Sequence, residues 1–115
     1  MSDIKALIKI IKKFRDERDW KQFHNPKDVA ISLVLEANEL LELFQWKNKS
    51  EIEEYIKYNK EKIGEELADV LYWVLLMSHD FGIEIGEALE KKIAENEKKY
   101  PVKKARGKHT KYDKL

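Results

Sequence analysis

Two pairs of acidic residues stand out because each lies within an apolar stretch of the chain. Glu36 and Glu39 lie three positions apart in the first stretch. Glu66 and Asp69 repeat this spacing in the second. At about 100° per residue, positions three apart share one face of a helix, and the apolar neighbours fall on that face too. We therefore expect two helices to point four carboxylates inward.

Four inward carboxylates are costly unless a cation neutralises them. Two like charges about 5 Å apart repel by roughly 3 kcal/mol at an effective dielectric of about 20, and desolvation adds to that cost. Two such pairs rival the roughly 5–15 kcal/mol that stabilises a whole domain. Oxygen ligands favour a hard cation, so the pattern predicts a site for Mg²⁺ or Mn²⁺. The alternative is that each carboxylate pairs with a lysine or arginine at a helix edge.

Composition narrows the classes of function. The 115 residues fit one domain, and 23 basic against 22 acidic side chains give a net charge of +1. This balance favours neither nucleic acid nor a membrane surface as the main partner. The absence of cysteine excludes disulfides, zinc knuckles and thiol chemistry. With no apolar run near the roughly 18 residues of a membrane span and no signal-peptide pattern, we expect a cytoplasmic protein.

Helical signals cover most of the chain, and no strand is predicted. Apolar residues at helical spacing predict a first helix that ends near Asp19. Asn25 followed by Pro26 is typical of a helix start, because Asn caps free amides and Pro fits the first turn. The second helix then runs to about Trp46.

The third predicted helix opens at Ser50, which forms a capping box with Glu53. Its polar first part is either a separate segment or a kinked extension of the apolar part that follows. Gly82 ends this helix. A fourth helix covers 84–99 and stops at Pro101.

Four principal helices around the acidic pairs predict an all-α, four-helix bundle. Residues 1–100 form the expected helical domain, and residues 101–115 form a basic tail. Such a tail is either solvated or holds phosphates near an acidic metal site, and the sequence leaves both open. Apolar residues on several helix faces imply burial between subunits, so we expect a homodimer or homotetramer.

Rings gather where the first helix ends. Trp20, Phe23 and His24 either line a pocket for a flat ligand or form a satellite core. The positions of the histidines argue against a di-iron site. None follows a glutamate of the acidic pairs by three residues, whereas the Glu-x-x-His ligand set of di-iron bundles requires that spacing.

The acidic pairs, taken together, resemble the metal-binding signature of the MazG-like all-α nucleoside triphosphate pyrophosphohydrolases. Segments 15–26, 40–47 and 100–107 are similar to the small single-domain dCTP pyrophosphatases within that group. The resemblance covers nearly the whole chain. One departure is Asn38, where related sequences tend to have Gly.

The resemblance implies that the four carboxylates hold Mg²⁺ and that water attacks the α-phosphorus, releasing a nucleoside monophosphate and pyrophosphate. Glu36 or Glu39 would orient or deprotonate that water. It also implies a deoxynucleoside triphosphate substrate, dCTP or a modified pyrimidine analogue. The residues it assigns to the base and the phosphates are Trp20, His24, Trp46, Trp73, Asn96, Lys99, Tyr100 and Arg106.

A competing hypothesis is a non-catalytic helical interaction module. Its inward carboxylates would pair with lysines, and its basic tail would bind a partner or nucleic acid. Binding of Mg²⁺ distinguishes the two hypotheses, because only the enzyme requires it.

Overall fold

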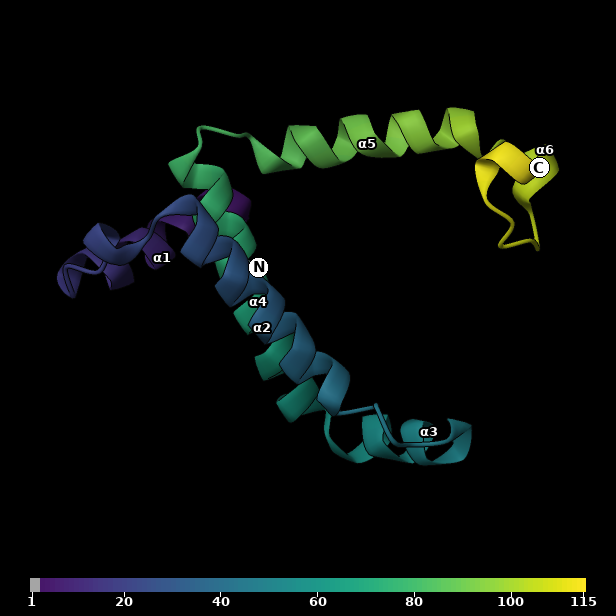
Figure 1. Cartoon of the computed structure of the whole chain (residues 1–115), viewed down its shortest axis with the longest axis horizontal. Coiled ribbons are helices and arrows are strands. Elements are labelled where there is room, and N and C mark those ends of the chain that lie inside the picture. Colours follow the sequence, from purple (N-terminus) through teal and green to yellow (C-terminus); the bar gives the residue numbers. More distant parts are fainter. Residues whose placement is uncertain (1–2) are drawn as a thin grey trace. The chain divides into compact units, whose positions relative to one another are not determined.

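The computed structural model describes residues 3–115, which contain helices and turns but no strand (Figure 1). This confirms the predicted all-α fold. The helices are α1 (Ile4–Glu17), α2 (Pro26–Glu42), α3 (Lys49–Tyr58), α4 (Lys60–Asp80), α5 (Ile85–Lys99) and α6 (Val102–Ala105), and the short 3₁₀ helices are η1 (Lys21–Phe23) and η2 (Tyr112–Lys114).

The chain forms two compact units. The first is Met1–Gly82 and contains α1 to α4. The second is Ile83–Leu115 and contains α5 and α6. Both acidic pairs therefore belong to the first unit, one on α2 and the other on α4.

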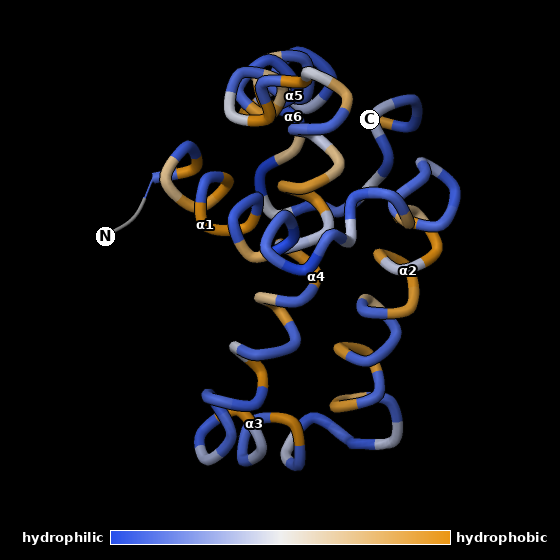
Figure 2. The backbone as a smooth tube through the Cα atoms, turned by 90° about the vertical axis from the view of Figure 1, so that its left-hand side faces the viewer, coloured by the Kyte–Doolittle hydropathy of each residue, from blue (hydrophilic) through white to orange (hydrophobic). Residues whose placement is uncertain are grey.

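Helix α4 is the centre of the first unit. It lies beside α2 over much of its length, and it also contacts α1 and α3 (Figures 1 and 2). Figure 2 shows apolar positions along both α2 and α4. Among the described residues, the buried apolar side chains are Val29 of α2 and Leu75 and Leu76 of α4. The apolar pattern of α4 thus places it between neighbours, as the sequence predicts.

Two of the predicted helix ends are confirmed. The Asn25 side chain accepts a hydrogen bond from the Asp28 N–H at 2.9 Å, and Pro26 is the first residue of α2. At the end of α4, Gly82 has a φ of +69°, a backbone conformation that side chains with a Cβ rarely adopt. These residues stop and start helices for the local reasons that the sequence suggested.

The start of the third predicted helix is corrected. The capping box consists of Asn48 and Glu51: Glu51 N–H donates to the Asn48 side chain, and Asn48 N–H donates to Glu51 Oε1. Ser50 already lies inside α3, so the box predicted from Ser50 and Glu53 is wrong by two residues. Asn caps as well as Ser, which explains the choice of the earlier site. The polar segment is a separate helix, because the backbone leaves helical geometry at Asn59.

Large apolar side chains remain exposed on the first unit. Ile31, Val34 and Leu35 of α2 and Leu67 and Leu71 of α4 are all in this class. No helix in the described part of the chain is both long and apolar enough to cross a membrane.

Candidate functional site

The structure brings the two acidic pairs together. One carboxylate oxygen from each residue lies within 4.8 Å of those of the other three. Glu66 is buried, Glu36 is half-buried, and the other two residues are exposed, so the group has a closed side and an open side. We call this group the acidic cluster, and it consists of Glu36, Glu39, Glu66 and Asp69.

Crowding changes the proton affinity of the acidic cluster. The pKa of Glu36 is raised from 4.5 to about 7, first by burial and then by a hydrogen bond with Glu39 and by the charges of the other three carboxylates. Burial and nearby negative charge both disfavour the ionised form. Oε2 of Glu36 and Oε2 of Glu66 are buried without a hydrogen-bond partner in the described residues. These oxygens are positioned to accept a cation.

A lysine satisfies one member of the acidic cluster. Lys62 Nζ lies 3.0 Å from Glu66 Oε1, one turn earlier on α4. Its side chain is 51% exposed and also lies 4.0 Å from Glu65. Within residues 3–115, the other three carboxylates have no basic side chain within ion-pair distance. The all-oxygen set with unpartnered buried atoms therefore fits a hard divalent cation better than four separate salt bridges.

Two of the predicted substrate residues meet beside the acidic cluster. Trp73 follows Asp69 by about one turn of α4, and its ring lies 5.4 Å from the His24 ring in an edge-to-face arrangement. Burial, and next the charge of Arg15, lower the pKa of His24, which favours the neutral form of its imidazole. His24 Nδ1 is buried and lacks a hydrogen-bond partner in the part of the chain described. A neutral ring beside an indole suits a flat polar ligand.

The remaining predicted residues come from other segments of the chain. Trp20 packs edge-on against Phe14 at 5.6 Å, and Phe14 and Trp73 both contact the Tyr72 ring edge-on, so Trp20 joins the same row of rings as Trp73. Trp46 follows the end of α2 and is 86% exposed, so its ring makes little contact with other side chains. The second unit holds the residues predicted for the phosphates, which are Asn96, Lys99, Tyr100 and Arg106.

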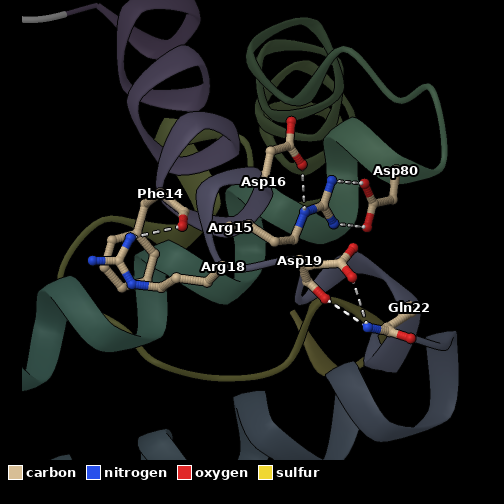
Figure 3. A network of polar contacts seen from close by, with 7 residues as sticks. All are labelled: Phe14, Arg15, Asp16, Arg18, Asp19, Gln22 and Asp80. Carbon is tan, nitrogen blue, oxygen red and sulfur yellow. Dashed lines mark hydrogen bonds and ion pairs between the residues drawn. The ribbon is translucent and has the colours of Figure 1, made fainter.

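Sequence reasoning missed a two-point ion pair that lies close to His24. Arg15 donates two hydrogen bonds to Asp80, with Nη1 2.7 Å from Oδ2 and Nη2 3.0 Å from Oδ1 (Figure 3). The Arg15 side chain is only 1% exposed. Its carbonyl also accepts a hydrogen bond from the Trp20 N–H. No local sequence pattern links positions so far apart, whereas the spacing of Lys62 and Glu66 at i and i+4 could have revealed that pair.

Comparison with known proteins places this geometry in a family. The profile of the MazG-like family matches residues 31–115, which include the whole acidic cluster. The chain belongs to the MazG-like family. This confirms the resemblance inferred from the acidic pairs.

Named relatives and a solved structure agree with the assignment. Rat dCTP pyrophosphatase 1 is 38% identical over 104 residues, and the human protein of that name is 36% identical. The match covers 89% of this chain and 61% of each of these relatives, so the chain spans less than two thirds of their length. A pyrophosphatase from Archaeoglobus fulgidus is 38% identical with a TM-score of 0.82, covering 88% of this chain and 94% of that one. This likeness supports the predicted fold type.

Proposed function

We propose that this chain is a divalent-metal-dependent nucleoside triphosphate pyrophosphohydrolase. It converts a deoxynucleoside triphosphate, first of all dCTP or a modified pyrimidine analogue, to the monophosphate and pyrophosphate. The observation that carries the proposal is the acidic cluster, whose ligand atoms lie within 4.8 Å of one another. The names of the MazG-like relatives supply the reaction and the base.

The acidic cluster would hold Mg²⁺, or Mn²⁺ in its place. Oxygen-only ligands and the two unpartnered buried oxygens support a hard ion. When bound, the ion would neutralise part of the triphosphate charge and lower the pKa of the attacking water. The protein itself holds the carboxylates in place through the contact between α2 and α4.

Glu36 or Glu39 is the proposed proton acceptor. Both lie on α2, and the raised pKa of Glu36, about 7, supports its acceptance of a proton at neutral pH in the metal-free protein. A general base is most effective when its pKa is near the working pH. A carboxylate of this pair that is not fully engaged in ligation would orient the water or take its proton.

Two sets of residues are proposed to bind the nucleotide. On the base side, His24 offers an unpartnered Nδ1 next to the Trp73 ring, and we assign Trp20 and Trp46 to the same role. Stacking on an aromatic side chain accepts any base, because every base has a flat face. The imidazole nitrogen adds a directional hydrogen bond. The residues proposed for the phosphates are Asn96, Lys99, Tyr100 and Arg106, the last within the basic tail 101–115.

The proposed active form is a homodimer or homotetramer. The exposed apolar side chains of α2, which include Val34 at 60% exposure, would be covered by a second copy of the chain. A monomer rarely leaves such a continuous apolar face in water. Light scattering after size-exclusion chromatography tests this directly: a monomer at micromolar concentration would contradict it.

A substrate screen tests the proposed reaction. The protein is incubated with each deoxynucleoside and ribonucleoside triphosphate and Mg²⁺, and pyrophosphate and orthophosphate are measured separately. The proposal predicts pyrophosphate as the product, with dCTP or a 5-modified analogue as the preferred substrate. Absence of turnover together with absence of Mg²⁺ binding would favour the non-catalytic helical module.

A further inference from the structure

A second charged groove lies away from the acidic cluster. It has a volume of about 400 Å³ and runs along α1 where this helix meets the C-terminal part of α4. Four lysines and one carboxylate of α1 line it together with one imidazole from α4. These residues are Lys5, Lys9, Lys12, Lys13, Asp16 and His79, and we call the site the lysine groove.

The helical spacing puts the lysines in a row. Lys5, Lys9 and Lys12 fall within about 60° of one another around α1, because each residue advances the helix by about 100°. From Lys5 to Lys13 the row is about 12 Å long at a rise of about 1.5 Å per residue. Like charges three and four residues apart on a helix repel each other. A row of this kind is therefore stabilised by an anion that contacts several ammonium groups at once.

Little negative charge within the protein offsets this row. In the part of the chain that the structure describes, no carboxylate lies within ion-pair distance of Lys5, Lys9 or Lys12. Lys13 reaches Glu17 only at 3.9 Å. Asp16 is the lining carboxylate, and the Nε of Arg15 lies 3.8 Å from it (Figure 3). The groove thus keeps a net positive charge.

We propose that the lysine groove binds a short phosphate chain, either inorganic polyphosphate or the triphosphate of a nucleotide. Lysines act as point charges toward phosphate oxygens, and an imidazole N–H adds a directional donor. The volume of the groove falls in the range of small-ligand sites. Asp16 and Glu17 follow the row on α1, so their charges oppose a nucleic acid backbone that continued along the helix.

The lysine groove is separate from the acidic cluster, although its His79 also lines a cavity with His24, which we assign to the base. His79 follows Asp69 by ten residues on α4, which is about 15 Å along the helix axis. The groove also needs no divalent ion, because its own side chains are cationic. Its occupancy can therefore be measured without catalysis, and the inference does not depend on the function proposed for the acidic cluster.

Calorimetry on the full chain tests the proposal. Tripolyphosphate is titrated into the protein in metal-stripped buffer without a chelator, because chelators are themselves polyanions. The double variant Lys9→Gln/Lys12→Gln is compared with Lys57→Gln/Lys60→Gln, which makes the same charge change at exposed positions of α3 and α4. We expect saturable binding by the wild type, a loss of at least about tenfold in the groove variant, and a change of about twofold or less in the control.

Further titrations separate the sources of the phosphate chain. If dCTP binds as tripolyphosphate does and the groove variant loses both, the ligand is a nucleotide triphosphate. If only tripolyphosphate binds, the ligand is inorganic. Absence of saturable binding, or equal weakening in both double variants, would overturn the proposal. Tighter binding of duplex DNA, with affinity that grows with duplex length, would overturn it too, since the groove would then be part of a nucleic-acid surface.

Discussion

Arg15 and Asp80 join the first helix to the end of α4 through a two-point ion pair, although 65 residues separate them in the chain. The Arg15 side chain is 1% exposed and the Asp80 side chain is 18% exposed, so water screens the pair only partly. The same arginine lowers the pKa of His24 and accepts a hydrogen bond from the Trp20 N–H through its carbonyl. One residue thus links the core to the side chains that we assign to the base.

Replacing Asp80 with Asn leaves a buried guanidinium without its countercharge. We expect Asp80→Asn to lower the free energy of unfolding by about 2–4 kcal/mol. Urea denaturation measures this. The matched control is Asp16→Asn, because Asp16 lies 3.8 Å from the same guanidinium with a side chain that is 56% exposed. The control should change stability by less than about 1 kcal/mol. If the two variants lowered the free energy of unfolding equally, the two-point geometry and the burial of the Arg15–Asp80 pair would not contribute to stability.

The raised pKa of Glu36 makes the stability of the metal-free protein depend on pH. The folded-state pKa of about 7 lies above the ordinary value of 4.5, so the folded state binds this proton more tightly than the unfolded state. The resulting stabilisation is fully present below about pH 4.5 and is lost as the pH rises through about 7. The Glu36→Gln variant has no titrating carboxyl at this position, so its stability should not fall in this way as the pH rises.

Melting curves from pH 4.5 to 8 test this dependence. The difference in Tm between the wild type and Glu36→Gln should shift against the wild type as the pH rises. Glu42→Gln, at an exposed position of the same helix, serves as the control and should follow the wild type. Saturating Mg²⁺ should remove the pH effect, because the ion stabilises the ionised form. A constant difference in Tm across this range would contradict the account.

Lys62 competes with the proposed metal ion. Its ammonium group lies 3.0 Å from Glu66, a carboxylate that the ion would use. We expect Lys62→Met to strengthen binding of Mg²⁺ or Mn²⁺ by about twofold to fivefold, since exposed ion pairs are weak. Lys60→Met removes an exposed lysine from the same helix and should leave the affinity unchanged. If Lys62→Met weakened metal binding in calorimetry, the lysine would be a support of the site and not a competitor.

The exposure of Trp46 gives a clean test of the base assignment. At 86% exposure its removal costs little packing, so Trp46→Ala should keep the wild-type Tm. If the ring stacks on the base, KM should rise by about tenfold to a hundredfold. Tyr58→Ala removes another ring that is 70% exposed and should change neither quantity. Unchanged KM together with unchanged Tm would remove Trp46 from the base site.

Local patterns were sufficient to predict the longer helices but not all of their bounds, because α2 ends at Glu42 and not near Trp46, and the short helix α6 lies in the segment expected to be a tail. Apolar periodicity is a property of neighbouring residues. Asn25 caps the start of α2 with its side chain, and Gly82 allows the positive φ just after α4. The start of α3 was harder, because two overlapping capping boxes have the same spacing. The division after Gly82 had no local signal either, since it depends on which helices pack together.

Local sequence patterns predicted only part of the candidate site. Residues three apart on one helix share a face, so each acidic pair was visible in the sequence. The meeting of α2 with α4 was an inference from electrostatic cost and family resemblance. By contrast, the pairing of Arg15 with Asp80 depends on how the end of α4 lies against α1, and no spacing rule predicts it. The edge-to-face contact of His24 with Trp73 has the same origin.

The central claim is that the acidic cluster catalyses metal-dependent release of pyrophosphate. The most direct measurement is product analysis with dCTP and Mg²⁺ for the wild type, Glu36→Gln, Asp69→Asn and the control Glu65→Gln, with helicity checked by circular dichroism. Glu65 is an exposed neighbour of the cluster. The wild type and the control should each form one pyrophosphate for every dCMP. The rate of product formation should be at least about a hundredfold lower in both cluster variants. Undiminished pyrophosphate release by both folded cluster variants would contradict the account.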